Sequence, residues 1–278
     1  MRCRLPSLLS CLILCAATST LSQAASLQQQ RQYYDEAKAA LAKGDKGPYQ
    51  RYASALRDYP LTPYLTYDEL TARLKSASNQ EIEGFLAAHG DLPQASWMKL
   101  RWLRWLAERG EWQTFAKYYD PGLNFTELDC LNGQRQLAQG QTAEGYATAE
   151  KLWLVGKSQP EACDRLFDRW AAEGQLTEQR RWQRAKLAAE ARNYSLATLL
   201  SKNLPTLSNH GKLLVDVAQK PQMLTQTARF TPADDAMGDV VSLGLRRLAR
   251  QDPEQALSLL EGYSPVSYTH LRAHETLR

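Results

Sequence analysis

The sequence is poor in the residues that build catalytic and metal centres. Its 278 residues include only four histidines and five cysteines. The phosphate-binding patterns GxxxxGKS/T and GxGxxG do not occur, and HExxH and GxSxG are absent as well. His89 and His210 stand far apart without a partner at metal-ligand spacing, so we expect a structural role for each. The sequence therefore predicts no catalytic residue, no cofactor and no metal site.

Long apolar runs are equally scarce. One run occupies residues 8–17, after Arg2 and Arg4 and before Ser22 and Ala24, which stand at the −3 and −1 positions of a signal-peptidase site. The run is too short to span a bilayer, which takes about 20 residues. The layout is that of a secretory signal, so we predict export and cleavage after Ala24, with a retained anchor as the alternative. We expect no integral membrane segment in the mature chain.

The last 13 residues read VSYTHLRAHETLR, from 266 to 278. This string resembles one translated frame of a common transposase sequencing adapter. We therefore interpret residues 266–278 as read-through that is not native, with a polar helical tail as the alternative. His270, His274 and Glu275 receive no functional weight on this interpretation, although His-x-x-x-His is a spacing that metal sites use.

The chain also has little excess charge. The formal charge of +4 includes arginines of the signal and of the tail. Without residues 1–24 and 266–278, 30 basic and 29 acidic residues remain, a net charge of +1. This balance argues against a general electrostatic attraction to nucleic acid or to an anionic membrane.

Only two cysteines, Cys130 and Cys163, remain in the mature chain, because the other three lie in the signal. An isolated pair in an oxidising compartment is a natural disulfide, so we predict a bridge between them. By the chain-entropy argument, a loop of this length stabilises the fold by roughly 3–4 kcal/mol. Two buried thiols are the alternative.

The apolar residues of the chain recur at intervals of three and four, which predicts an all-α fold. Expected helices cover about 93–109, 124–138, 142–155, 161–173, 177–191, 194–203, 211–219, 233–250 and 253–261. Apolar stripes on two sides of residues 93–109 indicate a helix between neighbours.

Three side-chain patterns on these helices have an expected role. All seven tryptophans lie between Trp97 and Trp182, at helical spacing that favours a place in the core over sugar stacking. We interpret the basic run of Arg180, Arg181, Arg184 and Lys186 as a solvated face. Asp234 and Asp235 are expected to cap a helix N-terminus rather than to form a carboxylate dyad.

Short turns near residues 44, 110, 140, 193 and 252 separate the helices. The spacing follows no fixed period, and no long linker interrupts the pattern. The sequence therefore predicts one continuous, irregular α-superhelix, a solenoid of stacked helical hairpins, rather than a regular tetratricopeptide array.

Three segments resemble the soluble lytic murein transglycosylases. They are QRQYY at 30–34, DYPLTPYL at 58–65 and LWLVGKSQP at 152–160, which runs into the Cys163 helix. The resemblance implies a periplasmic enzyme whose N-terminal α-superhelix forms a ring or horseshoe. A separate lysozyme-like domain would cleave the MurNAc–GlcNAc bond of peptidoglycan, leaving 1,6-anhydromuramyl ends. Peptidoglycan glycan strands, and other cell-wall enzymes, are the partners that it implies.

The chain lacks the sequence patterns that surround the catalytic residue of this family. The family's catalytic glutamate lies in a Glu-Ser dipeptide before a Gly-Leu-Met-Gln stretch, and neither pattern occurs here. We therefore expect residues 25–265 to be the scaffold domain, incomplete at its C-terminus and without a catalytic residue. A non-catalytic periplasmic α-solenoid, serving as a protein-interaction scaffold, is the alternative.

Overall fold

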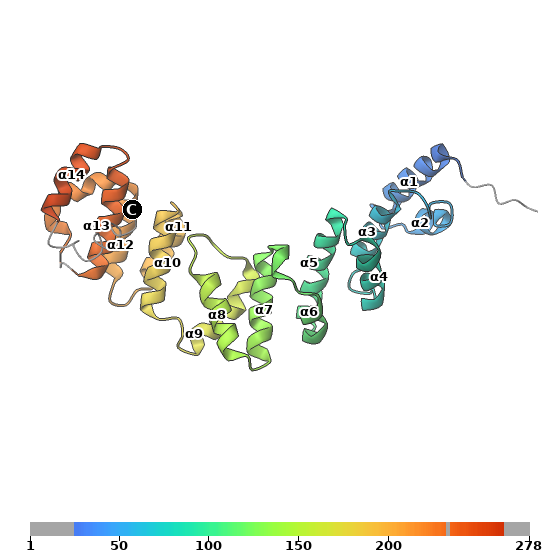
Figure 1. Ribbon diagram of the computed structural model, residues 1–278, viewed down its shortest axis with the longest axis horizontal. Helices are drawn as coiled ribbons and strands as arrows, with labels where there is room; N and C mark the ends of the chain where they lie inside the picture. Colours follow the sequence, from blue (N-terminus) through green and yellow to red (C-terminus); the bar gives the residue numbers. More distant parts are fainter. Residues whose placement is uncertain (1–24, 232–233, 264–278) are drawn as a thin grey trace, which may run out of the picture. The chain divides into compact units, whose positions relative to one another are not determined.

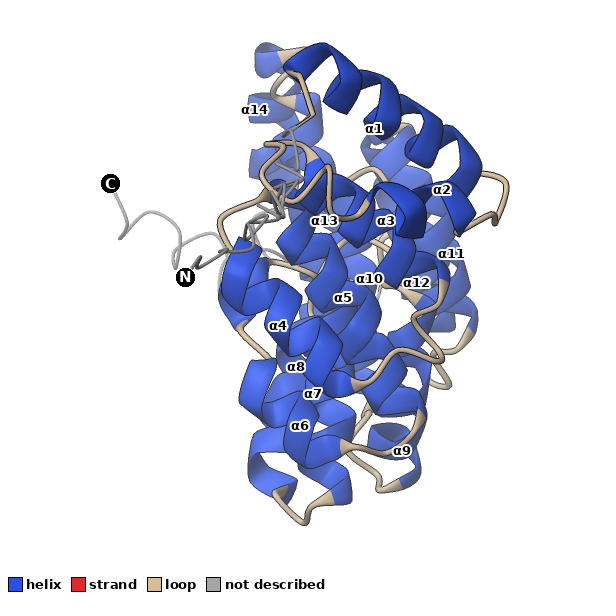
Figure 2. Cartoon of the chain, turned by 90° about the vertical axis from the view of Figure 1, so that its right-hand side faces the viewer, coloured by secondary structure: helices blue, strands red, loops and turns tan. Residues whose placement is uncertain are grey.

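A computed structural model of the chain describes residues 25–231 and 234–263. Within these ranges the chain consists of helices, turns and loops, and it contains no strand (Figure 1, Figure 2). Contacts divide it into two compact units, the first ending at Ala95 and the second beginning at Ser96. The predicted all-α class, built from successive helical hairpins, is confirmed. The predicted signal and the tail at 266–278 lie outside the described residues.

The first unit holds four helices with short connections. They are α1 (Leu27–Leu41), α2 (Gly47–Tyr52), α3 (Thr62–Ala72) and α4 (Asn79–His89). Helices α1 and α4 each begin at a capping box, in which a serine hydroxyl accepts from the backbone and the side chain three residues on accepts in return. Pro63 lies in the first turn of α3, where a proline costs no hydrogen bond.

The core of the first unit is small and rich in tyrosine. Tyr34 and Tyr59 pack at a tilt, with ring centres 5.5 Å apart, and Leu56 and Leu65 fill the space beside them. Nearer to the surface, Tyr33 and Tyr52 stack with ring centres 4.2 Å apart. Phenol rings supply apolar area together with a hydroxyl that needs a polar partner, so this core is held by both kinds of contact.

The second unit continues the hairpin arrangement over a longer stretch. Its helices are α5 (Pro93–Glu108, which begins just before the boundary), α6 (Trp112–Tyr118), η1 (Pro121–Leu123), α7 (Thr126–Ala138), α8 (Thr142–Trp153), η2 (Glu161–Cys163), α9 (Asp164–Ala172), α10 (Glu178–Glu190), α11 (Tyr194–Lys202), α12 (Ser208–Gln219), η3 (Pro221–Thr225), η4 (Thr227–Arg229), α13 (Asp235–Leu248) and α14 (Pro253–Gly262). Sequential helices pack on one another from α7 to α9 and from α10 to α14, and a single apolar cluster extends from α7 to Tyr263. Helix α12 begins three residues earlier than predicted, and the short helices η3 and η4 were not predicted.

Glycines close several of the helices in the left-handed backbone region. Gly44, Gly110 and Gly140, all three predicted as turns, have φ between 71° and 79°, and the unpredicted Gly174 has φ 75°. Such values cost a glycine nothing because it carries no Cβ. The turn after α10 differs, since Arg192 takes the left-handed conformation (φ 62°) and Asn193 instead caps α11.

Cys130 of α7 and Cys163 of η2 form a disulfide, the pairing that the sequence predicts. Their Cα atoms lie 4.8 Å apart, and both side chains are fully buried. The bridge ties the α7–α8 hairpin to the start of α9. Over the residues that the structure describes, none of the helices is long and apolar enough to cross a membrane.

Candidate functional site

The two histidines that the sequence singled out have structural surroundings. His89 packs against Phe85, with ring centres 5.3 Å apart. His210 is buried on α12, and its Nε2 lies 3.1 Å from a carboxylate oxygen of Asp234. Within residues 25–231 and 234–263, no group of three histidine, cysteine or acidic side chains is placed to hold a metal ion. His270 and His274 lie outside the described residues.

Asp234 acts as a helix cap, as predicted. Its Oδ1 accepts from the backbone N–H of Met237 at 2.8 Å, which satisfies one of the free donors at the start of α13. Its other oxygen faces His210. The carboxylate therefore joins the start of α13 to α12.

The prediction of a solvated basic face at Arg180–Lys186 is wrong. Arg184 is only 5% exposed, and its guanidinium lies 4.2 Å from the ring centre of Trp153. Burial lowers the pKa of Arg184. Lys186 pairs with Asp239 of α13 at 2.8 Å, and Arg180 pairs with Glu150 of α8 at 2.8 Å. The run is buried or paired because α10 is packed between neighbours, and long cationic stems can cover apolar surface in such places.

The prediction of core tryptophans holds for four of the seven. Trp102, Trp153, Trp170 and Trp182 are buried. Trp105 and Trp112 are half-buried. Trp97 is the exception: it is 51% exposed and packs at a tilt against Phe125, with ring centres 5.3 Å apart. One of the two apolar stripes of α5 therefore starts at the surface.

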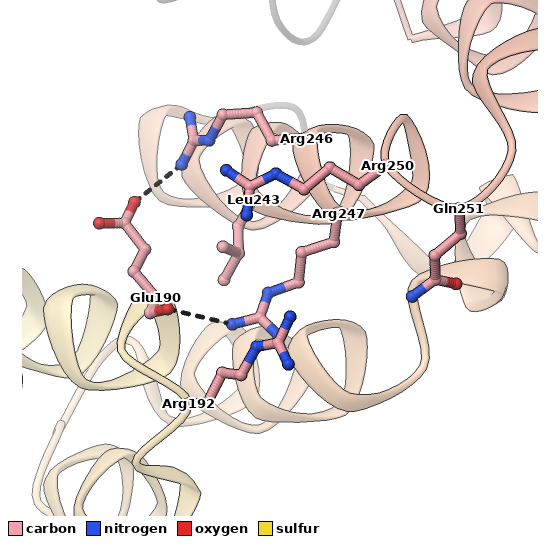
Figure 3. A pocket seen from close by; sticks show the side chains of 7 residues that line it. All are labelled: Glu190, Arg192, Leu243, Arg246, Arg247, Arg250 and Gln251. Atoms are coloured by element: carbon pink, nitrogen blue, oxygen red, sulfur yellow. Dashed lines mark hydrogen bonds and ion pairs between the residues drawn. The ribbon is translucent and has the colours of Figure 1, made fainter.

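A cavity rich in arginine lies where the end of α10 meets the end of α13 (Figure 3). We call it the arginine pocket. Its volume is about 440 Å³, and it is lined by Glu190, Arg192, Leu243, Arg246, Arg247, Arg250 and Gln251. The apolar side chain among these is Leu243, and the others are polar or charged.

Arg247 builds one wall of the arginine pocket. Its guanidinium donates to the carbonyl of Ala189 at 2.5 Å, to the carbonyl of Ala218 at 2.7 Å and to the hydroxyl of Tyr194 at 2.9 Å. These carbonyls belong to the last turns of α10 and α12, where few backbone N–H donors remain within the helix. The carbonyl of Ala189 also accepts from the backbone N–H of Arg192 at 3.1 Å. Arg247 thus caps two helix ends at once, and a positive charge there is favourable.

The other arginines of the pocket differ in how they are paired. Arg246 forms an ion pair with Glu190 at 2.8 Å, and both side chains are about half exposed. In the described part of the chain, the side chains of Arg192 and Arg250 make no hydrogen bond or ion pair. Gln251 accepts from Gln222 at its Oε1 and turns its amide nitrogen towards the arginines (Figure 3).

Sequence reasoning missed this pocket. Arg246 and Arg250 are four residues apart and would share a face of the helix predicted for residues 233–250, although α13 ends at Leu248. Arg192 comes from a different hairpin, and its left-handed backbone is not predictable for an arginine. Only the tertiary fold brings the two segments together.

Comparison with known proteins finds relatives of the chain. It is 31% identical over 239 residues to the soluble lytic murein transglycosylase of Escherichia coli K12 and 32% identical over 237 residues to that of Salmonella typhimurium. These matches cover 86% and 85% of the chain but 37% of each relative, so the chain spans little more than a third of their length.

Solved structures agree with these relatives. An inactive mutant of the lytic transglycosylase Slt from Pseudomonas aeruginosa is 69% identical, with a TM-score of 0.83 over 85% of this chain and 38% of its own. The 70 kDa soluble lytic transglycosylase of Escherichia coli is 30% identical, with a TM-score of 0.72 over 88% of this chain and 40% of its own. A second structure of a 70 kDa soluble lytic transglycosylase, in complex with bulgecin A, matches equally well.

One further match points elsewhere. The profile of the cucumovirus coat protein family matches residues 130–231, which is less than half of the chain. The same residues fall within the longer transglycosylase matches, so the short match defines no family here. The fold is that of the lytic transglycosylase structures. The chain belongs to the soluble lytic murein transglycosylases.

Proposed function

We propose that this chain is the N-terminal scaffold part of a periplasmic lytic transglycosylase. The whole protein then cleaves the MurNAc–GlcNAc bond of peptidoglycan and leaves 1,6-anhydromuramyl ends. The observation that supports this most strongly is the 69% identity with the Pseudomonas aeruginosa transglycosylase across 85% of the chain. On this proposal, residues 1–24 are an export signal, residues 25–265 are scaffold, and residues 266–278 are not native.

The scaffold role follows from what the chain lacks. It has no Glu-Ser dipeptide and no Gly-Leu-Met-Gln stretch, which in this family accompany the catalytic glutamate. A single glutamate that acts first as acid and then as base is sufficient for the family's reaction, so no other carboxylate of this chain needs a catalytic role. The helical hairpins then shape the access of glycan strands to an active site that other residues of the whole protein supply.

Incubation of the purified chain with peptidoglycan sacculi tests whether the chain is a scaffold without catalytic activity of its own. We expect no release of soluble anhydromuropeptides, measured by chromatography and mass spectrometry, while the active Pseudomonas aeruginosa enzyme serves as the positive control. Turnover by the chain alone would show that it contains an active site and would contradict the scaffold role.

A chimera tests the proposal from the other side. Residues 25–263 replace the aligned residues of the Pseudomonas aeruginosa enzyme, and release from sacculi is compared with that of the parent enzyme. We expect activity within a few fold of the parent, because the two scaffolds are 69% identical. A folded but inactive chimera would favour the alternative, a non-catalytic solenoid. The DNA after codon 265 distinguishes the same alternatives, since the enzyme requires an in-frame Glu-Ser and a lysozyme-like domain there.

A further inference from the structure

We propose that the arginine pocket is a binding site for an oxyanion group, a carboxylate or a phosphate, on a ligand with at least two negative charges. The pocket lies wholly within the second unit, and its lining comes from the end of α10, the end of α13 and the turn after each of these helices (Figure 3). The proposal depends on this pocket and not on the enzyme activity of the whole protein.

The arginine pocket carries a net positive charge. Four arginines and one glutamate line it, so its formal charge is +3. The carboxylate of Glu190 is engaged by Arg246, and Arg247 is met by two backbone carbonyls and a tyrosine hydroxyl, which are neutral. Like charges gathered in one cavity repel one another, and a bound anion removes that cost.

Stabilisation of the fold explains the presence of only some of the arginines in the pocket. Cations at the C-terminal ends of helices are favourable, and Arg247 fills that role for α10 and α12. Arg192 and Arg250 do not, because their side chains contact no carbonyl or carboxylate in the described part of the chain. Both side chains therefore line the same cavity without a partner in the described fold.

The chemistry of the lining selects the class of ligand. A guanidinium presents a planar fork of N–H donors that matches carboxylate and phosphate oxygens. Arg192, Arg250 and the amide nitrogen of Gln251 supply such donors from different sides (Figure 3). Leu243 provides one apolar contact, so a compact anion with a short carbon skeleton fits better than a bare ion. Dicarboxylate peptides and phosphate share this oxyanion chemistry.

Titration calorimetry of the full chain at low ionic strength tests the proposal. The probes are citrate, the dipeptide L-Ala-D-Glu and inorganic phosphate. We expect one-to-one binding of at least one probe, weakening as salt is added. Binding of citrate and dipeptide without phosphate assigns the site to carboxylates, and binding of phosphate alone assigns it to phosphate. If none of the three binds, the proposal is wrong.

Paired variants locate the binding. Arg192→Gln with Arg250→Gln removes two charges that hold no other group, and we expect affinity to fall at least tenfold. The matched control is Arg101→Gln with Arg229→Gln, which removes two exposed charges outside the pocket and should leave affinity within twofold. An equal loss in both double variants would mean that only net charge matters, and the site would be refuted.

A measurement on the unaltered chain keeps the test decisive if the variants fold poorly. Hydrogen exchange with and without the bound probe should show protection at residues 190–194 and 246–251, at the lining of the pocket. The first unit, at residues 27–89, should be unchanged. Protection only outside the pocket lining would overturn the proposal.

Discussion

The two compact units bury aromatic side chains in different ways. The core of the first unit rests on tyrosines, with Tyr34 against Tyr59 at its centre. The second unit buries tryptophans, places Arg184 over Trp153, and adds a disulfide. The first unit therefore depends on a small core with polar attachments, and the second on a long apolar cluster with a covalent link. We expect the second unit to resist denaturation better.

The distribution of tryptophan makes this comparison measurable. All seven tryptophans lie between Trp97 and Trp182, so tryptophan fluorescence reports on the second unit alone. Hydrogen exchange followed by mass spectrometry reports on residues 27–89 separately. Together the two readouts separate the units, and the expected effects are given in order of decreasing size.

The largest effect is expected from removing the disulfide. Cys130→Ala with Cys163→Ala frees a loop with a sequence separation of 33. The free energy of unfolding of the second unit should fall by about 4 kcal/mol, because the unfolded chain regains the entropy that the bridge removes. Urea denaturation followed by tryptophan fluorescence measures this loss, and the reduced wild-type chain should match the variant. An equal loss of protection at residues 27–89 would show that the units unfold together.

The second prediction concerns the buried guanidinium of Arg184. Arg184→Ala should cost about 3 kcal/mol, because it removes a desolvated cation–π contact and the packing of the side-chain stem. Arg184→Met keeps most of the stem and should cost less. Arg165→Ala, at an exposed position on α9, is the control and should stay within about 0.5 kcal/mol of the wild type. If Arg184→Ala were as mild as this control, the stacking over Trp153 would contribute nothing.

The third prediction compares a glycine in each unit. A Cβ at Gly244 on α13 would lie 2.4 Å from a methyl of Val217, so Gly244→Ala should destabilise the second unit by about 2 kcal/mol. A Cβ at Gly84 on α4 meets no atom within 4 Å, so Gly84→Ala should stabilise the first unit by about 0.5–1 kcal/mol. Chemical denaturation and hydrogen exchange measure whether the free energy of unfolding falls in the second unit and rises in the first. A stabilising Gly244→Ala would mean that α12 and α13 are not closely packed.

The smallest effect is expected at Glu178, which joins α10 to the segment before α12. Its carboxylate accepts from the N–H and hydroxyl of Thr206, at 2.7 and 2.8 Å, and from the N–H of Leu207 at 3.0 Å. Burial opposes ionisation, but these donors together lower the pKa of Glu178 below its usual 4.5. Glu178→Gln should therefore cost about 1 kcal/mol at neutral pH.

The pH dependence of that effect has a definite sign. A carboxyl whose pKa is lowered by folding contributes stability above its unfolded pKa and loses it as the pH falls through the folded pKa. The difference between wild type and Glu178→Gln should therefore be constant above about pH 5.5 and shrink below 4.5. A difference that persists unchanged in acid would assign the effect to packing rather than to the charge.

Local sequence signals were sufficient for most of the helices. Helices end at glycines such as Gly44, Gly110 and Gly140, and they begin at prolines such as Pro63 and Pro93. These signals come from backbone conformations that depend only on the residue itself. The Cys130–Cys163 bridge followed from counting cysteines in a chain that is predicted to be exported. Properties fixed by one residue and its neighbours are therefore readable from sequence.

The wrong or missing predictions concern residues whose neighbours come from distant segments of the chain. Arg184 looked solvated because charged residues usually are, yet Trp153 and Phe167, far back in the chain, cover it. Trp97 looked like core, but its neighbours leave half of it exposed. The arginine pocket joins residues 190–192 to residues 243–251, and no periodicity in either segment indicates that they are adjacent.

Arg247 also bears on how the second unit carries mechanical load. From its place on α13, a single guanidinium holds the carbonyl ends of α10 and α12. Bonds that share a force in parallel fail together, whereas bonds that are peeled apart open one at a time. A pull that moves α13 away from both α10 and α12 loads these contacts in parallel. This corner of the solenoid is expected to transmit a twist to the next hairpin as a rigid displacement instead of absorbing it by peeling.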